Sequence, residues 1–282
     1  MTVQAPTPGF VTRFAPSPTG HLHLGHAFSA LTAFEAARRA GGQCLLRFED
    51  IDTGRCRPAY IASIEEDLAW LGLDWPRPAR RQSEHADDYA AALDHLRARG
   101  LIYRCFKTRR EAAAEMSRAP HGPVGAYHGA ALAPPSEARL LERGFPFAWR
   151  LSVAAAEQAL GGFADLRIQD EIHGVFTADP WRSGDGVLAR KDVGVAYHLA
   201  VVVDDALQGV THVIRGEDLL EATHTQRLLQ ALLALPAPLW RHHPLILRPD
   251  GRRFAKRDQT ETLRDLRTRG VTASELRARL GF

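Results

Sequence analysis

The sequence predicts an α/β fold: a doubly wound parallel sheet, interrupted by an inserted α+β subdomain and followed by a short helical tail. Three observations predict it. Buried-strand patterns alternate with amphipathic helices over residues 1–104. Over residues 105–192 apolar and polar residues alternate along the strands, as is typical of half-exposed antiparallel strands. Apolar runs return over residues 193–247, and a basic loop and helical tail occupy residues 248–282. We expect four segments with these boundaries.

Composition places the chain among ordinary globular proteins. Its 282 residues are 45% hydrophobic and 24% charged, and the formal net charge of +3 neither demands nor excludes nucleic acid. Three distant cysteines predict no disulfide framework. The N-terminus lacks a signal-peptide pattern, and no apolar run approaches the roughly 20 residues that cross a bilayer. We expect a cytoplasmic monomer without membrane contact.

The N-terminal region predicts a strand, a loop and the start of a helix. Residues 10–14 form a β-branched and aromatic run that suits a buried strand, and Pro16 and Pro18 end it. Helix formers begin at Gly25. This order directs free backbone N–H groups and the positive end of a helix dipole at the loop, so we expect it to bind phosphate.

Two histidines flank the glycine at this helix start. His23 and His26 can donate hydrogen bonds to phosphate oxygens, and Gly25 lets a flat ring approach the backbone. The alternative is that these histidines, with His21, are solvated loop residues or a metal cluster.

A second strand, predicted over residues 43–48, is followed by acidic residues. Glu49, Asp50 and Asp52 come at its carboxyl end, the edge where open α/β sheets bind ligands. The same residues could instead form a turn or cap the helix that follows Pro58.

The remaining elements are predicted from periodicity and from breakers. Helices are expected over residues 60–73, 89–99, 221–234 and through the tail 260–282. Strands are expected over residues 101–103, 147–153, 166–170, 197–203, 209–218 and 243–247.

Three side chains far apart in the sequence are expected to meet at the carboxyl edge of the parallel sheet. Arg13, Tyr197 and Arg215 all stand at predicted strand ends, which a doubly wound sheet brings together. Two arginines facing one small substrate indicate carboxylate recognition, because the guanidinium group binds carboxylate in bidentate fashion. Tyr197 could instead be a core aromatic residue.

The motif Arg13–His26, RFAPSPTGHLHLGH, resembles a known family. Its last four residues resemble the HIGH signature of class I aminoacyl-tRNA synthetases, and the longer motif is similar to the glutamate-specific branch. The segment Arg253–Arg257, RFAKR, occupies the place of the companion KMSKS signature, without its first lysine and its serine. The resemblance implies a Rossmann-like catalytic domain, with the inserted subdomain as the connective domain that holds the tRNA acceptor end.

The resemblance also implies a reaction and its residues. Glutamate would react with ATP, accompanied by Mg²⁺, to form glutamyl-adenylate, and an RNA hydroxyl would then take the glutamyl group. The catalytic residues implied are His23, His26 and Lys256. The residues implied to bind L-glutamate are Arg13, Phe14, Ala15, Pro16, Ser17, Glu49, Tyr197 and Arg215. Those implied to bind ATP are His23, Gly25, His26, Arg253, Lys256 and Arg257.

The chain is most similar to short paralogues in this branch that glutamylate queuosine at the wobble position of tRNA(Asp). Only residues 259–282 follow Asp258, too few for a further domain that folds alone, so we expect no anticodon-binding domain and take tRNA(Asp) carrying queuosine as the partner. The alternatives are a minimal synthetase that charges the 3′ end of tRNA(Glu), an inactive tRNA-binding paralogue, and a small-molecule adenylating ligase.

Family members carry zinc in the inserted subdomain, and this sequence departs from that pattern. Cys105 and Tyr127 match, but Lys107 and Ala131 replace two cysteines. His121 or His128 could substitute, although a tetrahedral site needs four competent ligands. We expect no zinc, and a packed or hydrogen-bonded loop in its place.

Overall fold

The structure is a computed structural model that describes residues 9–116, 126–190, 194–246 and 261–282. Its strands are β1 (Val11–Phe14), β2 (Gln43–Phe48), β3 (Arg80–Arg81), β4 (Ile102–Cys105), β5 (Ala148–Leu151), β6 (Arg167–Asp170), β7 (Gly174–Thr177), β8 (Val187–Arg190), β9 (Gly194–Val195), β10 (His212–Gly216) and β11 (Leu239–His243). Its α-helices are α1 (Leu24–Arg39), α2 (Pro58–Trp70), α3 (Ala86–Ala98), α4 (Arg109–Met116), α5 (Pro134–Glu142), α6 (Val153–Leu160), α7 (Pro180–Ser183), α8 (Tyr197–Leu207), α9 (Leu220–Leu232), α10 (Leu263–Thr268) and α11 (Ala273–Arg279). Two 3₁₀ turns are η1 (Gln82–Glu84) and η2 (Glu217–Leu219).

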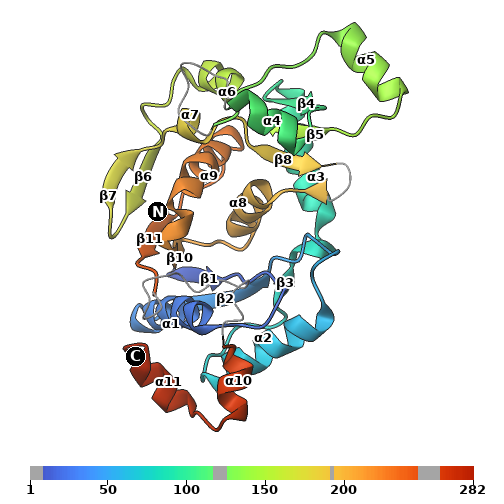
Figure 1. The fold of residues 1–282 in the computed structure, drawn as a ribbon. Helices are drawn as coiled ribbons and strands as arrows, with labels where there is room; N and C mark the ends of the chain where they lie inside the picture. The colour runs from blue at the N-terminus through green and yellow to red at the C-terminus, as the bar shows by residue number, and fades with distance from the viewer. Residues whose placement is uncertain (1–8, 117–125, 191–193, 247–260) are drawn as a thin grey trace, which may run out of the picture.

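Parallel strands form the centre of the molecule, as predicted. β1, β2 and β3 pair in parallel, and so do β10 and β11. The two groups meet where the Thr211 amide donates to the Val11 carbonyl at 2.9 Å. Helix α1 covers one face of these strands, and α8 and α9 lie on the other (Figure 1). The doubly wound arrangement therefore brings the carboxyl ends of β1, β2 and β10 to one edge.

A second, antiparallel sheet has the order β4-β5-β8-β9 and lies at the upper right of Figure 1. The predicted alternating strand near residue 150 is confirmed as β5. The apolar run at residues 101–103 was interpreted as part of the parallel sheet, which is wrong, because β4 pairs with β5 in antiparallel fashion. A short apolar run cannot by itself specify its partner strand.

The β6–β7 hairpin joins the parallel strands rather than the second sheet. β6 pairs antiparallel with β7 on one side and makes one parallel bridge on the other, from Asp170 to Trp240 of β11. The predicted strand at residues 166–170 is thus confirmed, and its last residue reaches β11.

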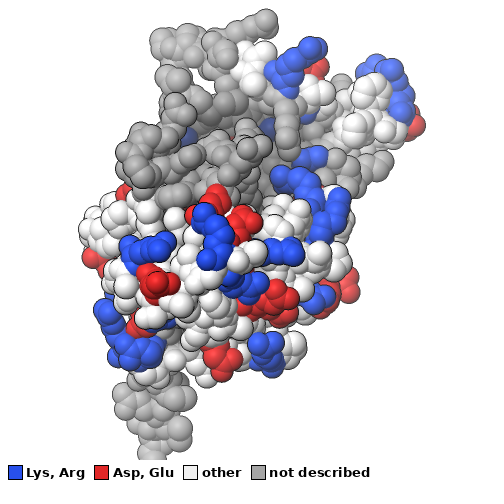
Figure 2. All heavy atoms as spheres, turned by 60° about the horizontal axis from the view of Figure 1, so that its bottom comes forward, with Lys and Arg blue, Asp and Glu red and all other residues white. Residues whose placement is uncertain are grey.

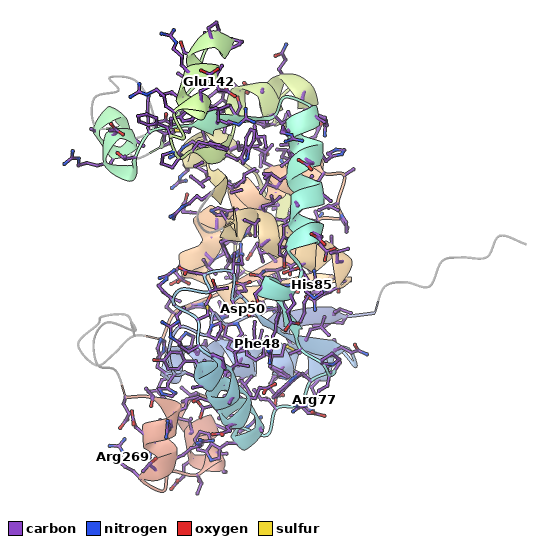
Figure 3. All side chains as sticks on the ribbon, turned by 90° about the vertical axis from the view of Figure 1, so that its right-hand side faces the viewer. Phe48, Asp50, Arg77, His85, Glu142 and Arg269 are labelled. Carbon is purple, nitrogen blue, oxygen red and sulfur yellow. The ribbon has the colours of Figure 1, made fainter. Side chains whose placement is uncertain are left out.

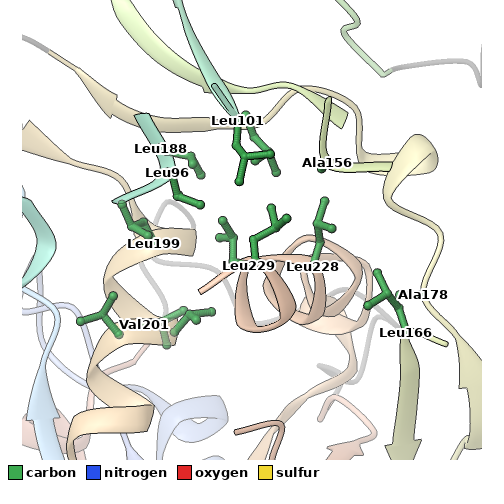
Figure 4. Packing of buried hydrophobic residues seen from close by; sticks show 14 of the residues in the cluster. Leu96, Leu101, Ala156, Leu166, Ala178, Leu188, Leu199, Val201, Leu228 and Leu229 are labelled. Carbon is green, nitrogen blue, oxygen red and sulfur yellow. The ribbon is translucent and has the colours of Figure 1, made fainter. Parts of the chain in front are cut away.

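The predicted strand at residues 197–203 is wrong: this segment is part of helix α8. Residues 199–205 are all buried, so the helix is apolar nearly all round and shows no 3.6-residue pattern. Figure 4 shows α8 and α9 packing together through Leu199, Val201 and Leu229, with Leu96 and Leu188 above them. A short, continuously apolar run fits a buried helix as well as a buried strand.

In the C-terminal part of the chain the structure differs from the predicted elements in two respects and agrees with them in one. The last strand, predicted at residues 243–247, lies at Leu239–His243 instead, because Pro244 cannot donate to a strand ladder. The tail is helical as predicted over residues 261–282, but as two helices, α10 and α11. It returns to the N-terminal motif: Thr262 forms a β-bridge with His23, and the Leu263 amide donates to the Leu22 carbonyl at 2.8 Å.

Charges of both signs are interspersed on the face shown in Figure 2, so its described residues present no field of one sign. Among the helices that the structure describes, none has the length and apolar character needed to cross a bilayer.

Candidate functional site

A cavity of about 540 Å³ opens at the carboxyl edge of the parallel strands. Every predicted site residue within the described ranges lines it: Arg13, Phe14, Ala15, Pro16, Ser17, His23, Gly25, His26, Glu49, Tyr197 and Arg215. Arg253, Lys256 and Arg257 lie outside the described residues. The cavity therefore gathers residues from β1, the start of α1, the end of β2, the start of α8 and the end of β10.

The two histidines form the N-terminal cap of helix α1. His23 is the N-cap residue, and its Nδ1 accepts from the Gly25 amide at 3.1 Å. His26 Nδ1 accepts in turn from the His23 amide at 3.2 Å, which completes a capping box. The ring centroids are 3.8 Å apart. Because both Nδ1 atoms are acceptors, each ring carries its proton on Nε2, and both are donors beside a helix N-terminus.

Arg13 is held by a buried ionic network. Its Nε donates to Asp205 Oδ1 at 3.0 Å, and Arg47 donates to the same oxygen at 2.7 Å. Burial opposes ionisation of Asp205, but the two guanidinium groups outweigh it and hold the pKa of Asp205 below its usual value. The network thus keeps a negative charge between two arginines and fixes the orientation of Arg13.

Glu49 lies on the other side of Arg47, whose Nη2 is 3.4 Å from Glu49 Oε1. Burial raises the pKa of Glu49, although Arg47 and Arg13 act against that shift. A cation that enters the cavity would favour the ionised carboxylate, so Glu49 is suited to bind an ammonium group.

Arg215 is positioned by a buried chain of hydrogen bonds. Its Nε donates to His242 Nε2 at 3.0 Å, and His242 Nδ1 lies 2.6 Å from Asp170 Oδ2. Burial, together with the Arg215 charge, lowers the pKa of His242 to about 4, so the imidazole is neutral. Asp170 therefore holds the proton on Nδ1 and leaves Nε2 as the acceptor for Arg215.

Tyr197 lies in a different secondary-structure element from the one predicted. It begins helix α8 instead of ending a strand, yet it still lines the cavity. Its hydroxyl lies 3.5 Å from Arg215 Nη1, and burial raises its pKa. The phenol is therefore neutral, and its oxygen accepts from Arg215 Nη1 at the cavity wall, while its ring also packs against the hydrophobic core.

Sequence reasoning missed several residues that hold the predicted ones in place: Arg47, Asp170, Asp205, Thr223 and His242. Arg47 stands two residues before Glu49, and Asp205 stands two residues after the misassigned segment 197–203, so both were visible as charged residues beside apolar runs. No local pattern distinguishes Asp170 or His242, because their hydrogen bond joins residues 72 positions apart.

The antiparallel sheet and the loops next to it are held by a buried carboxylate, close to Cys105 and Tyr127, which match the family's zinc pattern. Asp185 accepts from the Tyr103 hydroxyl and the Gly129 amide at 2.8 Å each, and from the Val153 amide at 2.9 Å. Cys105 Sγ lies 3.8 Å from the Tyr127 hydroxyl. Within the described residues, no three His, Cys, Asp or Glu side chains are grouped to hold a metal; His121 lies outside them. The absence of zinc stays a prediction.

The residues that flank the basic loop lie at the cavity. Ile246, at one end of the undescribed segment 247–260, lines it. Thr262, just beyond the other end, is bridged to His23. One end of this segment is thus at the cavity wall and the other is beside His23.

The arrangement combines two kinds of binding chemistry. Arg13 and Arg215 can bind carboxylate, Glu49 can bind an ammonium group, and the start of α1 can bind phosphate. In this α/β protein a site for a phosphate lies beside a site for an amino acid. This arrangement defines the class of proteins that activate amino acids with a nucleotide. The chain belongs to the family described as tRNA synthetases class I (E and Q), catalytic domain, whose model matches residues 10–277.

Similar proteins agree with this family. The chain is 43% identical to a glutamyl-Q tRNA(Asp) synthetase of Rhodobacter capsulatus, over 96% of this chain and 100% of that protein. It is 45% identical to one from Nocardia farcinica, over 99% of this chain and 86% of that protein. Among solved structures, a glutamate tRNA ligase of Elizabethkingia meningosepticum, in complex with its amino acid, matches with a TM-score of 0.72 and 30% identity over 93% of the chain. The chain spans 53% of the length of that ligase.

Proposed function

We propose that the protein activates L-glutamate with ATP and transfers the glutamyl group to the queuosine base at the wobble position of tRNA(Asp). The observation that carries this proposal is that one cavity is lined both by the start of helix α1, which is suited to bind an anion, and by Arg13, Glu49 and Arg215. The names of the relatives from R. capsulatus and N. farcinica support the acceptor.

In the proposed first step, an oxygen of the glutamate α-carboxylate attacks the α-phosphorus of ATP. A bond from this oxygen to phosphorus forms, the bond to the bridging oxygen breaks, and pyrophosphate leaves. Negative charge grows on the phosphate oxygens, where Nε2–H of His23 and of His26 would donate. The helix dipole of α1 adds positive potential at the same place.

Mg²⁺ would neutralise part of the triphosphate charge when it is bound. It usually binds through substrate phosphates and few protein ligands, which suits a cavity whose described lining includes two carboxylates, Glu49 and Asp218. Lys256, with Arg253 and Arg257, would stabilise the leaving pyrophosphate. The positions of Ile246 and Thr262 support that role.

In the second step, a hydroxyl of queuosine would attack the acyl carbon of glutamyl-adenylate, and AMP would leave with the electron pair. Arg13, Arg215 and Glu49 would hold the amino acid through both steps. Since the guanidinium groups are fixed by buried partners, little conformational freedom is lost on binding.

The activation step is tested by ATP–pyrophosphate exchange that depends on glutamate. We expect exchange with glutamate and not with aspartate or glutamine. No exchange in the parent protein would overturn the proposed activation.

The histidine pair is tested by His26→Gln. Glutamine at this helix position can still accept from the His23 amide and preserve the cap, so we expect an unchanged melting temperature. Losing the Nε2–H donor should lower the exchange rate about 10²- to 10³-fold. His21→Gln is the matched control, because His21 bonds to Ser63 and does not line the cavity. Equal rates in both variants would contradict the proposed role.

The acceptor is tested with queuosine-containing tRNA(Asp), tRNA(Asp) without queuosine, and tRNA(Glu). We expect glutamate on the first alone, attached to the anticodon nucleoside. Glutamate on the 3′ end of tRNA(Glu) would instead identify a minimal glutamyl-tRNA synthetase.

The protein is proposed to be a monomer, so its mass measured by light scattering should be that of one chain, 31.1 kDa.

A further inference from the structure

A second cavity, of about 490 Å³, lies between helix α3 and the antiparallel sheet. We infer that it binds an unstacked nucleobase of the RNA substrate, next to the nucleoside that reacts. This inference rests on the proposed function and adds a recognition site to it.

The sheet side of the cavity presents an aromatic platform. Trp149 of β5 lies opposite Ala189 of β8, which lies opposite Val195 of β9, and all three line the cavity. The small alanine beside the indole leaves space over the sheet. Phe147, two residues before Trp149 on the same face, meets the indole edge to face at 5.6 Å between ring centroids.

The indole is held in place from the neighbouring strand. Arg104 of β4 lies opposite Trp149, with its guanidinium carbon 4.6 Å from the ring centroid, and it is ion-paired with Glu137. A ring fixed by its neighbours loses little freedom when a base stacks on it, which favours binding.

The opposite wall consists of α3. Ala86 and Ala90 lie four residues apart on the helix face that lines the cavity, with Leu93 beyond them. Two small side chains facing an aromatic platform leave a slot suited to a flat ring. The volume falls within the range of small-molecule sites.

The two cavities are lined by residues that are two positions apart in the sequence. Glu49 lines the first and Ile51 lines the second, a separation of at most about 7 Å of extended chain. Asp50, between them, accepts from the Ser83 amide at 2.8 Å and from the Ser83 hydroxyl at 2.7 Å. This anchors the loop beside the lower end of α3, where Figure 3 shows Asp50 and His85. A strand of RNA with one nucleoside at Glu49 could place an adjacent base on Trp149.

The character of the lining favours a nucleobase over an anion or a cation. The described lining has aromatic, aliphatic and small polar side chains, one arginine, Arg190, and no acidic side chain. Aromatic faces stack on every base, whereas a phosphate would need several donors. The positive charge of Arg190 suits the phosphate that follows a bound base.

The test compares Trp149→Ala with Trp149→Phe. For transfer to queuosine-containing tRNA(Asp), we expect the KM for RNA to rise at least about fivefold in the alanine variant, the lower limit for one lost stacking contact. The phenylalanine variant should retain most of the affinity. RNA-independent ATP–pyrophosphate exchange should be unchanged in both, because neither touches the first cavity. An unchanged KM in Trp149→Ala would overturn the inference.

A second pair of variants avoids the sheet altogether. Ala90→Phe fills the cavity from the exposed face of α3, and Ala91→Phe adds the same ring one residue away, outside the cavity. We expect only Ala90→Phe to raise the KM for RNA. Equal effects of the two variants would show that the added bulk, and not the cavity, matters.

Binding without chemistry separates this inference from the proposed function. The probe is the anticodon stem-loop of tRNA(Asp), followed by fluorescence anisotropy. Suppose that both Trp149→Ala and Ala90→Phe bind this probe more weakly, but the parent protein does not activate glutamate. The base site would then be supported, and the proposed activation would be overturned. Normal binding by both, in an enzyme that activates glutamate, would overturn the base site alone.

Discussion

Each nitrogen of the Arg215 guanidinium group is fixed by a different part of the chain. Nε bonds to His242 of β11, Nη1 lies near Tyr197 of α8, and Nη2 donates to Thr223 Oγ1 of α9 at 2.8 Å. An arginine held in this way presents its charge to the cavity in one orientation. Carboxylate recognition by such a group is pre-organised, which saves side-chain entropy on binding.

Asp170 is expected to act on glutamate binding through His242. In Asp170→Asn, an amide NH₂ group facing His242 would move the imidazole proton to Nε2, where it opposes the Arg215 donor. We expect the KM for glutamate to rise about tenfold in the exchange assay, the effect of about 1.4 kcal/mol, with a smaller change in kcat.

The control for that variant is Glu171→Gln. Glu171 is the next residue and pairs with Arg241 on the partly exposed side of β11, away from Arg215. We expect its KM for glutamate to equal that of the parent. If Asp170→Asn changed only the melting temperature and not the KM, the positioning role would be refuted.

At the scale of elements, α2 and α10 meet over a buried carboxylate with an arginine close by. Asp67 of α2 is fully buried, and neither of its oxygens accepts a hydrogen bond from the described residues. Arg267 Nε of α10 is 3.5 Å away. Burial raises the pKa of Asp67 from 3.8 to about 6, more than Arg267 lowers it.

This pKa predicts a pH-dependent stability. The folded protein holds the Asp67 proton more tightly than the unfolded chain, so this contribution to stability is complete below pH 3.8 and is lost as the pH rises through about 6. We expect Asp67→Asn to be more stable than the parent at pH 8 and similar to it at pH 4, measured by urea unfolding. Glu65→Gln removes a different carboxylate from the same helix and should show no such gain. Absence of the gain in Asp67→Asn would contradict the assignment.

The inserted subdomain is expected to be stable without metal. Because Asp185 ties β4, the loop at Gly129 and α6 together, we expect EDTA to leave the melting temperature unchanged and the purified protein to contain no stoichiometric zinc by metal analysis.

Asp185→Ala should cost about 3 kcal/mol of unfolding free energy, because it leaves several buried donors unpaired. Cys105→Ser should cost much less. A fall in melting temperature on chelation would restore a metal to this site.

At the scale of the whole molecule, Asp205 joins helix α8 to two strands of the parallel sheet. It belongs to α8, and its two arginine partners come from β1 and β2, 192 and 158 residues away in the sequence. Loss of this carboxylate would leave Arg13 and Arg47 buried without their main counter-charge. Stability and substrate binding therefore depend on the same residue.

Asp205→Asn is expected to lower the unfolding free energy at pH 7 by about 3 to 5 kcal/mol, the usual cost of breaking a buried ion pair on one side. Since the pKa of Asp205 is lowered in the folded protein, its stabilisation is present above the ordinary value and is lost as the pH falls through the lower one. The difference between variant and parent should shrink in acid. Asp52→Asn, which removes a partly exposed carboxylate that is ion-paired with Arg55, is the control, and equal stability of the two variants at pH 7 would contradict this account.

The sequence by itself determined the parts of the protein whose physics is local. The strand, loop and helix start of residues 10–26 follow from a β-branched and aromatic run, two prolines and a run of helix formers within a few residues of one another. The strand before Glu49 has the predicted bounds, Gln43–Phe48, but its position left a turn or helix cap open, and the family resemblance singled out Glu49. The full set of glutamate- and ATP-binding residues was named from the family resemblance, and the cavity is also lined by residues that the sequence analysis did not name, such as Ser29 and Asp218.

Only the tertiary structure decided what depends on distant partners. Residues 197–203 form a helix because α9 and the residues around Leu96 bury them on all sides, and an apolar run alone does not distinguish that environment from a sheet. The chain Asp170–His242–Arg215 and the second cavity arise where elements far apart in sequence pack together. Their hydrogen bonds and shape exist only after folding, because no short segment contains both partners.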